Sequence, residues 1–158
     1  MTEIDFVING ILSVIEVWEP RLLALSEDKI SKKRNSQNRT VKQIVGHMCD
    51  SASNNTHRAV HLQYQKSPLD FPNYAIDGNN DRWIAIQNYQ DEDWHVLLQL
   101  WKYSNIHIAH VFRNIDESKL SNKWKYSEDR LITLKEGIID YLRHLKLHLS
   151  EIEELMNS

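Results

Sequence analysis

The chain has 158 residues, a length that suits one domain, here expected to span residues 1–158. Only four glycines and three prolines occur, which predicts few turns and therefore a few long helices rather than a many-stranded sheet. The net charge of −3 argues against a nucleic-acid partner, because phosphate affinity needs clustered lysine and arginine. Cys49 is the single cysteine, which excludes an intrachain disulfide. With no recognisable signal peptide or membrane-spanning stretch, we expect a cytoplasmic protein without a membrane partner.

The first helical pattern runs from about Thr2 to Leu25, with apolar residues at spacings of three and four. Thr2 followed by Asp5 is typical of a helix N-cap with an acidic third position. Pro20 lies inside the pattern, and we expect it to kink the helix or to split it in two.

Three further long segments repeat the helical period. Thr40 is a good N-cap for the second helix, which should end near Gln65 because Pro68 and Pro72 follow. The predicted segments are residues 40–65, 91–114 and 131–156, with a short extra turn over 81–87. Residues 67–80 and 116–129 are expected to be connections. The sequence therefore predicts an all-α protein, a four-helix bundle with long connections, one of which can cross the bundle.

Histidines on the predicted helices suggest a metal site. His144 and His148 are four residues apart on one helix, so both rings can reach one ion. A helical wheel places this pair at one edge of the apolar stripe, and places His47 at the edge of the second helix's stripe. Such an edge position is partly buried yet open to substrate.

The remaining histidines fall elsewhere on the wheel. His57, His61 and His110 point away from the core and should be solvated, whereas His107 is borderline. Spacing alone does not decide between a ligand and a hydrogen-bonded histidine at a helix interface.

Two motifs carry a family resemblance. The segment Thr40-Val-Lys-Gln-Ile-Val-Gly-His47-Met-Cys-Asp50-Ser51 resembles the second-helix motif of the DinB/YfiT-like superfamily. The segment Asp140-Tyr-Leu-Arg-His144-Leu-Lys-Leu-His148-Leu-Ser-Glu-Ile152 resembles the last-helix motif of that superfamily. The stretch from Trp83 to Tyr89, followed by Trp94, is similar to the middle of its members, so the resemblance spans most of the chain.

The resemblance implies a four-helix bundle, often dimeric, so a homodimer is expected. It also implies that His47, His144 and His148 bind one divalent transition metal: zinc, nickel or iron. Many members carry adjacent histidines where this chain has Leu147, but Leu147 faces away from the stripe edge and should not affect ligation.

The chemistry of such a site leaves alternatives open. Three imidazoles leave coordination positions free, which is typical of catalytic metals. The superfamily contains thiol-dependent transferases, which suggests transfer of a low-molecular-weight thiol to an electrophilic small molecule. Metal-dependent hydrolysis is the alternative, and a non-catalytic metal-binding or dimeric scaffold is a third.

Few residues offer themselves as catalytic partners of the metal. Tyr141 lies one turn before His144, and Asn105 lies in the middle of an apolar stripe, so both are weak catalytic candidates. Asp50 is predicted at the surface or beside a ligand rather than as a base. Cys49 is predicted to be a buried, inert thiol.

Overall fold

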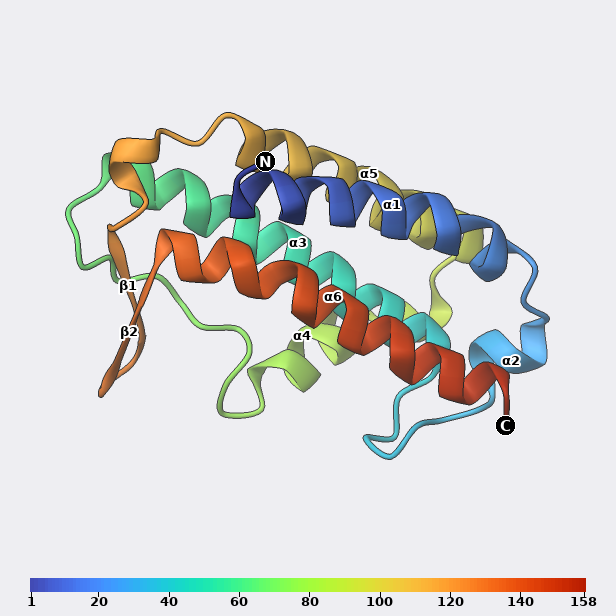
Figure 1. Ribbon diagram of the computed structural model, residues 1–158. Helices are drawn as coiled ribbons and strands as arrows, with labels where there is room; N and C mark the ends of the chain where they lie inside the picture. Colours follow the sequence, from blue (N-terminus) through green and yellow to red (C-terminus); the bar gives the residue numbers. More distant parts are fainter.

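The protein is described by a computed structural model that covers residues 1–158, and four long helices dominate it (Figure 1). In chain order the elements are α1 (Glu3–Leu23), α2 (Glu27–Ser31), α3 (Val41–Tyr64), α4 (Asn79–Gln87), the 3-10 turn η1 (Tyr89–Asp91), α5 (Trp94–Arg113), the 3-10 turn η2 (Glu117–Lys119), β1 (Lys123–Ser127), β2 (Arg130–Thr133) and α6 (Leu134–Met156).

The long helices form a four-helix bundle with an unusual order. Helix α1 packs against α5 and α6, and α3 packs against the same two helices. Consecutive long helices α1 and α3 are therefore diagonal neighbours, as are α5 and α6. In Figure 1, α1 and α6 run in one direction, and α3 and α5 run in the other. The prediction of an all-α four-helix bundle with long connections is confirmed, and the connection from α3 to α5 returns along the bundle.

Capping residues fix where three of the long helices begin. Thr2, Thr40 and Thr133 each accept a hydrogen bond from the backbone of the third helical residue, whose side chain bonds back to the cap. This reciprocal pair satisfies two backbone donors that a helix start leaves free. The predicted starts at Thr2 and Thr40 are therefore confirmed.

Two sequence expectations for helices need correction. Of the two outcomes predicted for Pro20, a kink or a split, the split is wrong, because α1 continues to Leu23. The proline occupies the last turn, where only three further helical residues follow, and its carbonyl still accepts a hydrogen bond from Ala24 (3.2 Å). The expected extra turn after residue 80 is a full helix, α4.

A β-hairpin occupies a region predicted as a connection and a helix start. Strands β1 and β2 pair antiparallel, so Leu131 belongs to a strand and α6 begins only at Leu134. The hairpin is held from outside by the segment after α3, because Leu69 makes backbone hydrogen bonds to Lys123 (2.7 Å) and Lys125 (3.0 Å). These partners are distant in sequence, so local periodicity did not reveal the hairpin.

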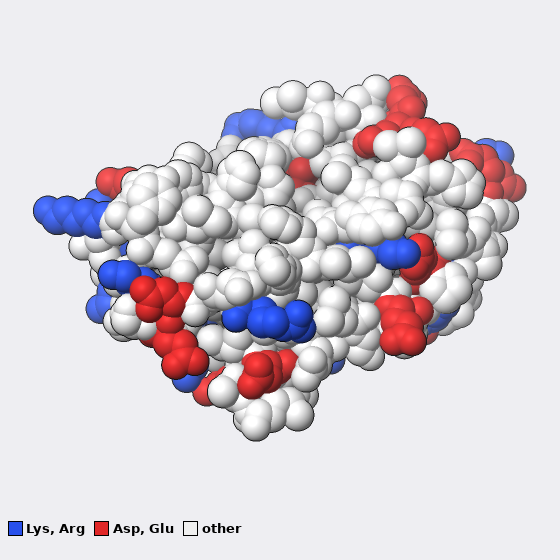
Figure 2. All heavy atoms as spheres, turned by 90° about the horizontal axis from the view of Figure 1, so that it is seen from above, with Lys and Arg blue, Asp and Glu red and all other residues white.

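One apolar core joins the helices and the hairpin. The side chains at its centre include Ile11, Ile44, Met48, Leu97, Trp101, Ile138, Leu149 and Ile152. Most lie on the predicted stripes. None of the helices combines the length and hydropathy that crossing a membrane requires. Figure 2 looks onto the side of α1 and α5, where uncharged side chains cover most of the surface.

Candidate metal centre

Three histidines from two helices meet between α3 and α6. His47 comes from α3, and His144 and His148 come from consecutive turns of α6. One ring nitrogen of each lies within 4.8 Å of the other two. The ring centroids are 4.3 Å apart for His144 and His148, and 4.5 Å apart for His47 and His148. The structure therefore brings together the three residues that the sequence selected.

Gly46, the residue before His47, allows Tyr89 to pack closely against α3. A Cβ atom on Gly46 would lie 2.2 Å from the ring of Tyr89. Glycine in a helix interior costs about 1 kcal/mol relative to alanine. Here it lets the Tyr89 ring pack directly on the α3 backbone, one residue before His47.

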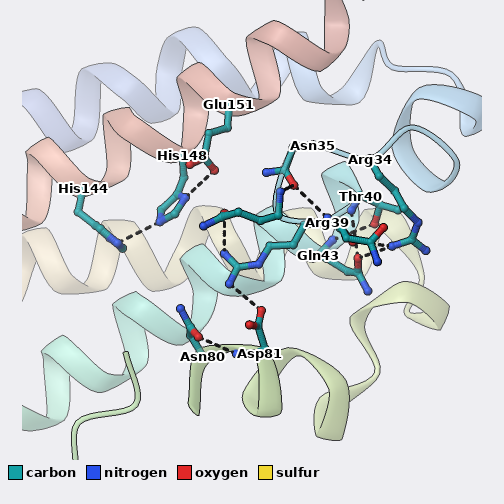
Figure 3. Close-up of polar contacts among 12 residues, drawn as sticks. Arg34, Asn35, Arg39, Thr40, Gln43, Asn80, Asp81, His144, His148 and Glu151 are labelled. Carbon is teal, nitrogen blue, oxygen red and sulfur yellow. Dashed lines mark hydrogen bonds and ion pairs between the residues drawn. The ribbon is translucent and has the colours of Figure 1, made fainter. Parts of the chain in front are cut away.

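Glu151 orients one of the three rings (Figure 3). Its carboxylate accepts a hydrogen bond from Nδ1 of His148 at 2.9 Å. The other ring nitrogen, Nε2 of His148, lies 3.0 Å from Nε2 of His144, within hydrogen-bond distance. Metal-binding histidines commonly have such a carboxylate partner, which fixes the tautomer and ring orientation. The sequence prediction missed Glu151, although an acid three residues after His148 was a readable signal.

The histidines are electrically suited to bind a cation. Burial lowers the pKa of His47 to about 2 and the pKa of His144 to about 4. Both rings are therefore neutral at pH 7, and neutral imidazole is the form that binds metals. Nδ1 of His47 is buried without a hydrogen-bond partner, a state that is costly unless something binds it.

The spacing of the nitrogens also fits one ion. Three nitrogens that each lie about 2.0–2.1 Å from a tetrahedral zinc are roughly 3.4 Å apart. The observed separations reach up to 4.8 Å, so the nitrogens would have to approach one another by at most about 1.4 Å to reach this value. The three histidines are the whole cluster of potential ligands there, with no fourth acidic or cysteine side chain closing it.

An ion pair between a buried arginine and an exposed aspartate lies beside the histidines. Arg39 is 5% exposed, and its Nη2 lies 2.8 Å from Oδ1 of Asp81 on α4. Figure 3 shows Arg39 between the Glu151 side of α6 and helix α4. The pair therefore fastens α4 across this side of the site.

The other side of the site opens into a cleft of about 540 Å³. His144 and Tyr141 line it from α6, Ser51 lines it from α3, and Tyr74 lines it from the connection after α3. Burial raises the pKa of Tyr74 to about 12, so its hydroxyl is neutral and can donate a hydrogen bond. Its ring lies 6.0 Å from that of His47. No helical pattern pointed to Tyr74.

Tyr141 and Asn105, the two weak catalytic candidates, are hydrogen-bonded to each other. The Tyr141 hydroxyl donates to the Asn105 carbonyl oxygen (2.7 Å), and the Asn105 amide donates to the backbone of Trp101 (2.8 Å). Both side chains are buried. Asn105 thus joins α5 to the diagonally opposite α6 by a hydrogen bond across the core.

Of the two positions predicted for Asp50, at the surface or beside a metal ligand, the surface position is wrong. Asp50 is 2% exposed, and its Oδ1 accepts hydrogen bonds from the Tyr89 hydroxyl (2.6 Å) and the Gln87 amide (2.8 Å). The segment around α4 and η1 covers this face of α3, which the helical wheel assigned to solvent. Burial raises the pKa of the Asp50 carboxyl. Cys49 is buried and burial raises the pKa of its thiol, as predicted for an inert cysteine.

The histidines outside the cluster follow the wheel with one exception. His57 and His110 are exposed as predicted, and His107 is exposed as well. His61 is only half-buried rather than solvated, because its ring packs near Phe71 in the connection after α3, 5.5 Å between centroids. Leu147 is exposed, which confirms that it faces away from the site.

Solved structures with the same architecture were found by comparison. YfiT from Bacillus subtilis is described as a probable metal-dependent hydrolase with an unusual four-helix bundle topology. It superposes with a TM-score of 0.84 at 18% sequence identity, covering 98% of this chain and 86% of YfiT. The chain has the YfiT fold. The shared feature is a four-helix bundle whose helix order departs from the usual one.

A second similar structure is a larger enzyme. The mycothiol-dependent maleylpyruvate isomerase superposes with a TM-score of 0.76 at 12% identity. A histidine-to-alanine mutant of that enzyme gives the same TM-score at 11% identity. In both cases 94% of this chain is covered but only 60% of the isomerase chain. The sequence matches no protein-family model and no curated protein.

Proposed function

We propose that this protein is a metal-dependent enzyme that activates a low-molecular-weight thiol and transfers it to an electrophilic small molecule. The observation that carries the proposal is the convergence of His47, His144 and His148 at the edge of an open cleft. A structural metal would need a fourth protein ligand, whereas three ligands beside a cleft suit catalysis. The proposed ion is zinc, nickel or iron, all of which suit imidazole.

The side chains of the cleft favour a nucleophile that needs no separate base. A divalent metal would lower the pKa of a thiol or water that it binds, and so supply a nucleophile at neutral pH. The acidic side chains nearby already have partners. Glu151 accepts a hydrogen bond from His148, and Asp140 forms an ion pair with Arg143 (2.6 Å). Tyr74 is neutral at pH 7 and can orient a bound substrate as a hydrogen-bond donor.

Metal-dependent hydrolysis is the second candidate. It is favoured by the likeness to YfiT, a probable metal-dependent hydrolase, while thiol transfer is favoured by the likeness to a mycothiol-dependent enzyme. A thiol loses its proton more readily than water does, because its ordinary pKa lies far lower. For a cleft without a free base, this difference favours the thiol.

The test compares the parent protein with His144→Ala and with His107→Ala, an exposed histidine on α5 that serves as the control. Metal content is measured on protein purified without a polyhistidine tag. Each zinc-loaded protein then receives a small thiol with a chromogenic electrophile, and separately a panel of esters and amides.

We expect the parent and the His107→Ala protein to hold about one metal per chain and to conjugate the thiol. The His144→Ala protein should lose both properties. Ester or amide cleavage without thiol turnover would contradict the transferase proposal and support the hydrolase. Metal binding with neither reaction would leave a non-catalytic scaffold.

We also propose that two copies of the chain pair through α5. Its exposed apolar side chains lie at helical spacing on one face: Val96, Leu100, Tyr103 and Ile106. Few charges interrupt the surrounding surface (Figure 2), and such patches often mark protein interfaces. A Leu100→Glu variant should sediment as a monomer while the parent sediments as a dimer; a monomeric parent would contradict the pairing.

A further inference from the structure

The cleft beside the three histidines extends along the bundle towards the β-hairpin. From α3 it is lined in turn by Ser51, Asn55 and Arg58, and these residues lie one, two and about three turns beyond His47. At 1.5 Å per residue, Asn55 lies roughly 12 Å along the helix from His47. The cleft is therefore long enough for an extended small molecule rather than a compact one.

The far end of the cleft holds an arginine without an acidic partner. The guanidinium of Arg58 lies 3.8 Å above the ring of Trp124, and its only hydrogen bond goes to the side-chain oxygen of Asn55. It takes part in no ion pair. Because a guanidinium carries five N–H donors, four remain without a protein acceptor.

The surroundings of Arg58 hold it in place. Trp124 is buried, and its indole N–H donates to the carbonyl of Phe71 (2.9 Å), so the ring is a fixed platform. The guanidinium also donates a hydrogen bond to Asn55, which lies about one turn nearer to His47 on α3. Burial lowers the pKa of Arg58 to about 10, which still leaves it charged at pH 7.

No acidic side chain of the cleft forms an ion pair with Arg58. Of the two acids that line the cleft, Glu136 accepts hydrogen bonds from Thr133 at the start of α6, and Asp140 pairs with Arg143. Arg130 adds a second cation without an ion pair, stacked 5.0 Å from the Tyr126 ring. A half-buried guanidinium without a counter-ion is costly, and a planar anion such as a carboxylate matches its donors in pairs.

We propose that this end of the cleft is an anion subsite, in which Arg58 binds a carboxylate of an elongated small-molecule ligand whose reactive end lies at His47, His144 and His148. Arg130 covers the bound carboxylate from the hairpin. This assignment rests on the proposed function for the position of the reactive end, but not for the anion subsite itself. It names the ligand class as organic acids that extend roughly 10 Å between the acid and the reacting atom.

The test uses 8-mercaptooctanoate and its uncharged counterpart 8-mercaptooctanol. Binding is measured by calorimetry on the zinc-loaded protein. In a second arm, NMR titration of the metal-free protein with octanoate and with octanol follows the Arg58 side-chain N–H and the Trp124 indole N–H. The variants are Arg58→Gln, Arg130→Gln and, as a matched loss of charge on the hairpin outside the cleft, Lys125→Gln.

We expect the parent to bind the acid about 10-fold or more tightly than the alcohol, because hydrogen bonds to charged groups are the strong ones. Octanoate alone should shift both N–H signals without metal. Arg58→Gln should abolish the preference, Arg130→Gln should reduce it, and Lys125→Gln should keep it. Because Arg58 packs on Trp124, its loss should itself move the Trp124 indole signal, so unchanged backbone N–H signals along the hairpin verify the fold of unliganded Arg58→Gln. Should that variant unfold, Arg130→Gln and the octanoate shifts decide.

Equal affinity for acid and alcohol would overturn the anion subsite. So would a preference that survives in Arg58→Gln, or one that appears only with zinc and without shifts at Arg58, since the carboxylate would then be binding the metal. Octanoate shifts at Arg58 in a protein that neither binds metal nor turns over thiol would support the subsite while refuting the proposed function.

Discussion

Glu151 should control the affinity of the metal site without touching the metal. Its carboxylate accepts a hydrogen bond from Nδ1–H of His148 (2.9 Å) and so would hold Nε2 towards a bound ion. In Glu151→Gln the amide oxygen can still accept this hydrogen bond. The variant loses the negative charge that makes the imidazole of His148 a stronger metal ligand. Loss of such partners costs 10–100-fold in metal affinity. We expect about 10-fold weaker zinc binding for Glu151→Gln and nearer 100-fold for Glu151→Ala.

The measurement is competition for zinc against a chromogenic chelator at fixed pH. Glu154→Gln is the matched control, because Glu154 is exposed on the same helix and its substitution removes the same charge. The control should bind zinc within about twofold of the parent, since exposed charges interact weakly through water. If Glu151→Gln matched the control, the charge of Glu151 would not strengthen His148 as a ligand. If Glu151→Ala also matched it, the hydrogen bond between Glu151 and His148 would not orient a ligand, and the reasoning would be refuted.

Four further changes have expected outcomes. Gly46→Ala should lower the free energy of unfolding by about 1–3 kcal/mol in a denaturant titration, because the new Cβ would overlap the Tyr89 ring; an unchanged midpoint would contradict that packing. Asp50→Asn should lower the free energy of unfolding by about 1–3 kcal/mol, because the amide oxygen keeps both hydrogen bonds but the amide nitrogen takes the place of Oδ2, which is buried without a partner; an unchanged midpoint would contradict that burial. The metal-free protein should lose stability as the pH falls from about 6.5 to about 4, because His47 and His144 have pKa values below that of unfolded histidine and the unfolded chain takes up protons first; a flat profile in calorimetry would oppose this. Removing the metal should lower Tm but leave a folded protein by circular dichroism, since the apolar core joins all four long helices; an unfolded apo-protein would indicate a structural metal.

Hydrophobic periodicity predicted the parts of this fold that are made by neighbours in sequence. The apolar stripes gave the four long helices, and Thr2 and Thr40 fixed two of their starts. The same stripes placed His47, His144 and His148 at the edge of the core, where the structure brings them together. Each of these features depends only on helical geometry, which a sequence displays directly.

The errors share a different physical cause. A helical wheel treats every face outside the apolar stripe as solvated, but the segment from α4 to η1 packs on that face of α3. Asp50 is therefore buried against Tyr89, and His61 is half covered by the connection near Phe71. The β-hairpin was missed because its stabilising partner is Leu69, more than fifty residues away.

The missed segments are also the ones that turn a cluster of histidines into a site with a substrate cleft. The bundle alone supplies the three imidazoles, because two antiparallel helices suffice to bring them together. The connection after α3 adds Tyr74, and the hairpin adds Trp124, the platform that fixes Arg58. Under these proposals, the four-helix bundle determines metal binding, and the connection after α3 and the β-hairpin determine which ligands bind. Variants in the hairpin should then change which ligands bind while leaving the metal affinity unchanged. Variants of the three histidines should lower the metal affinity while keeping the preference for a carboxylate at Arg58.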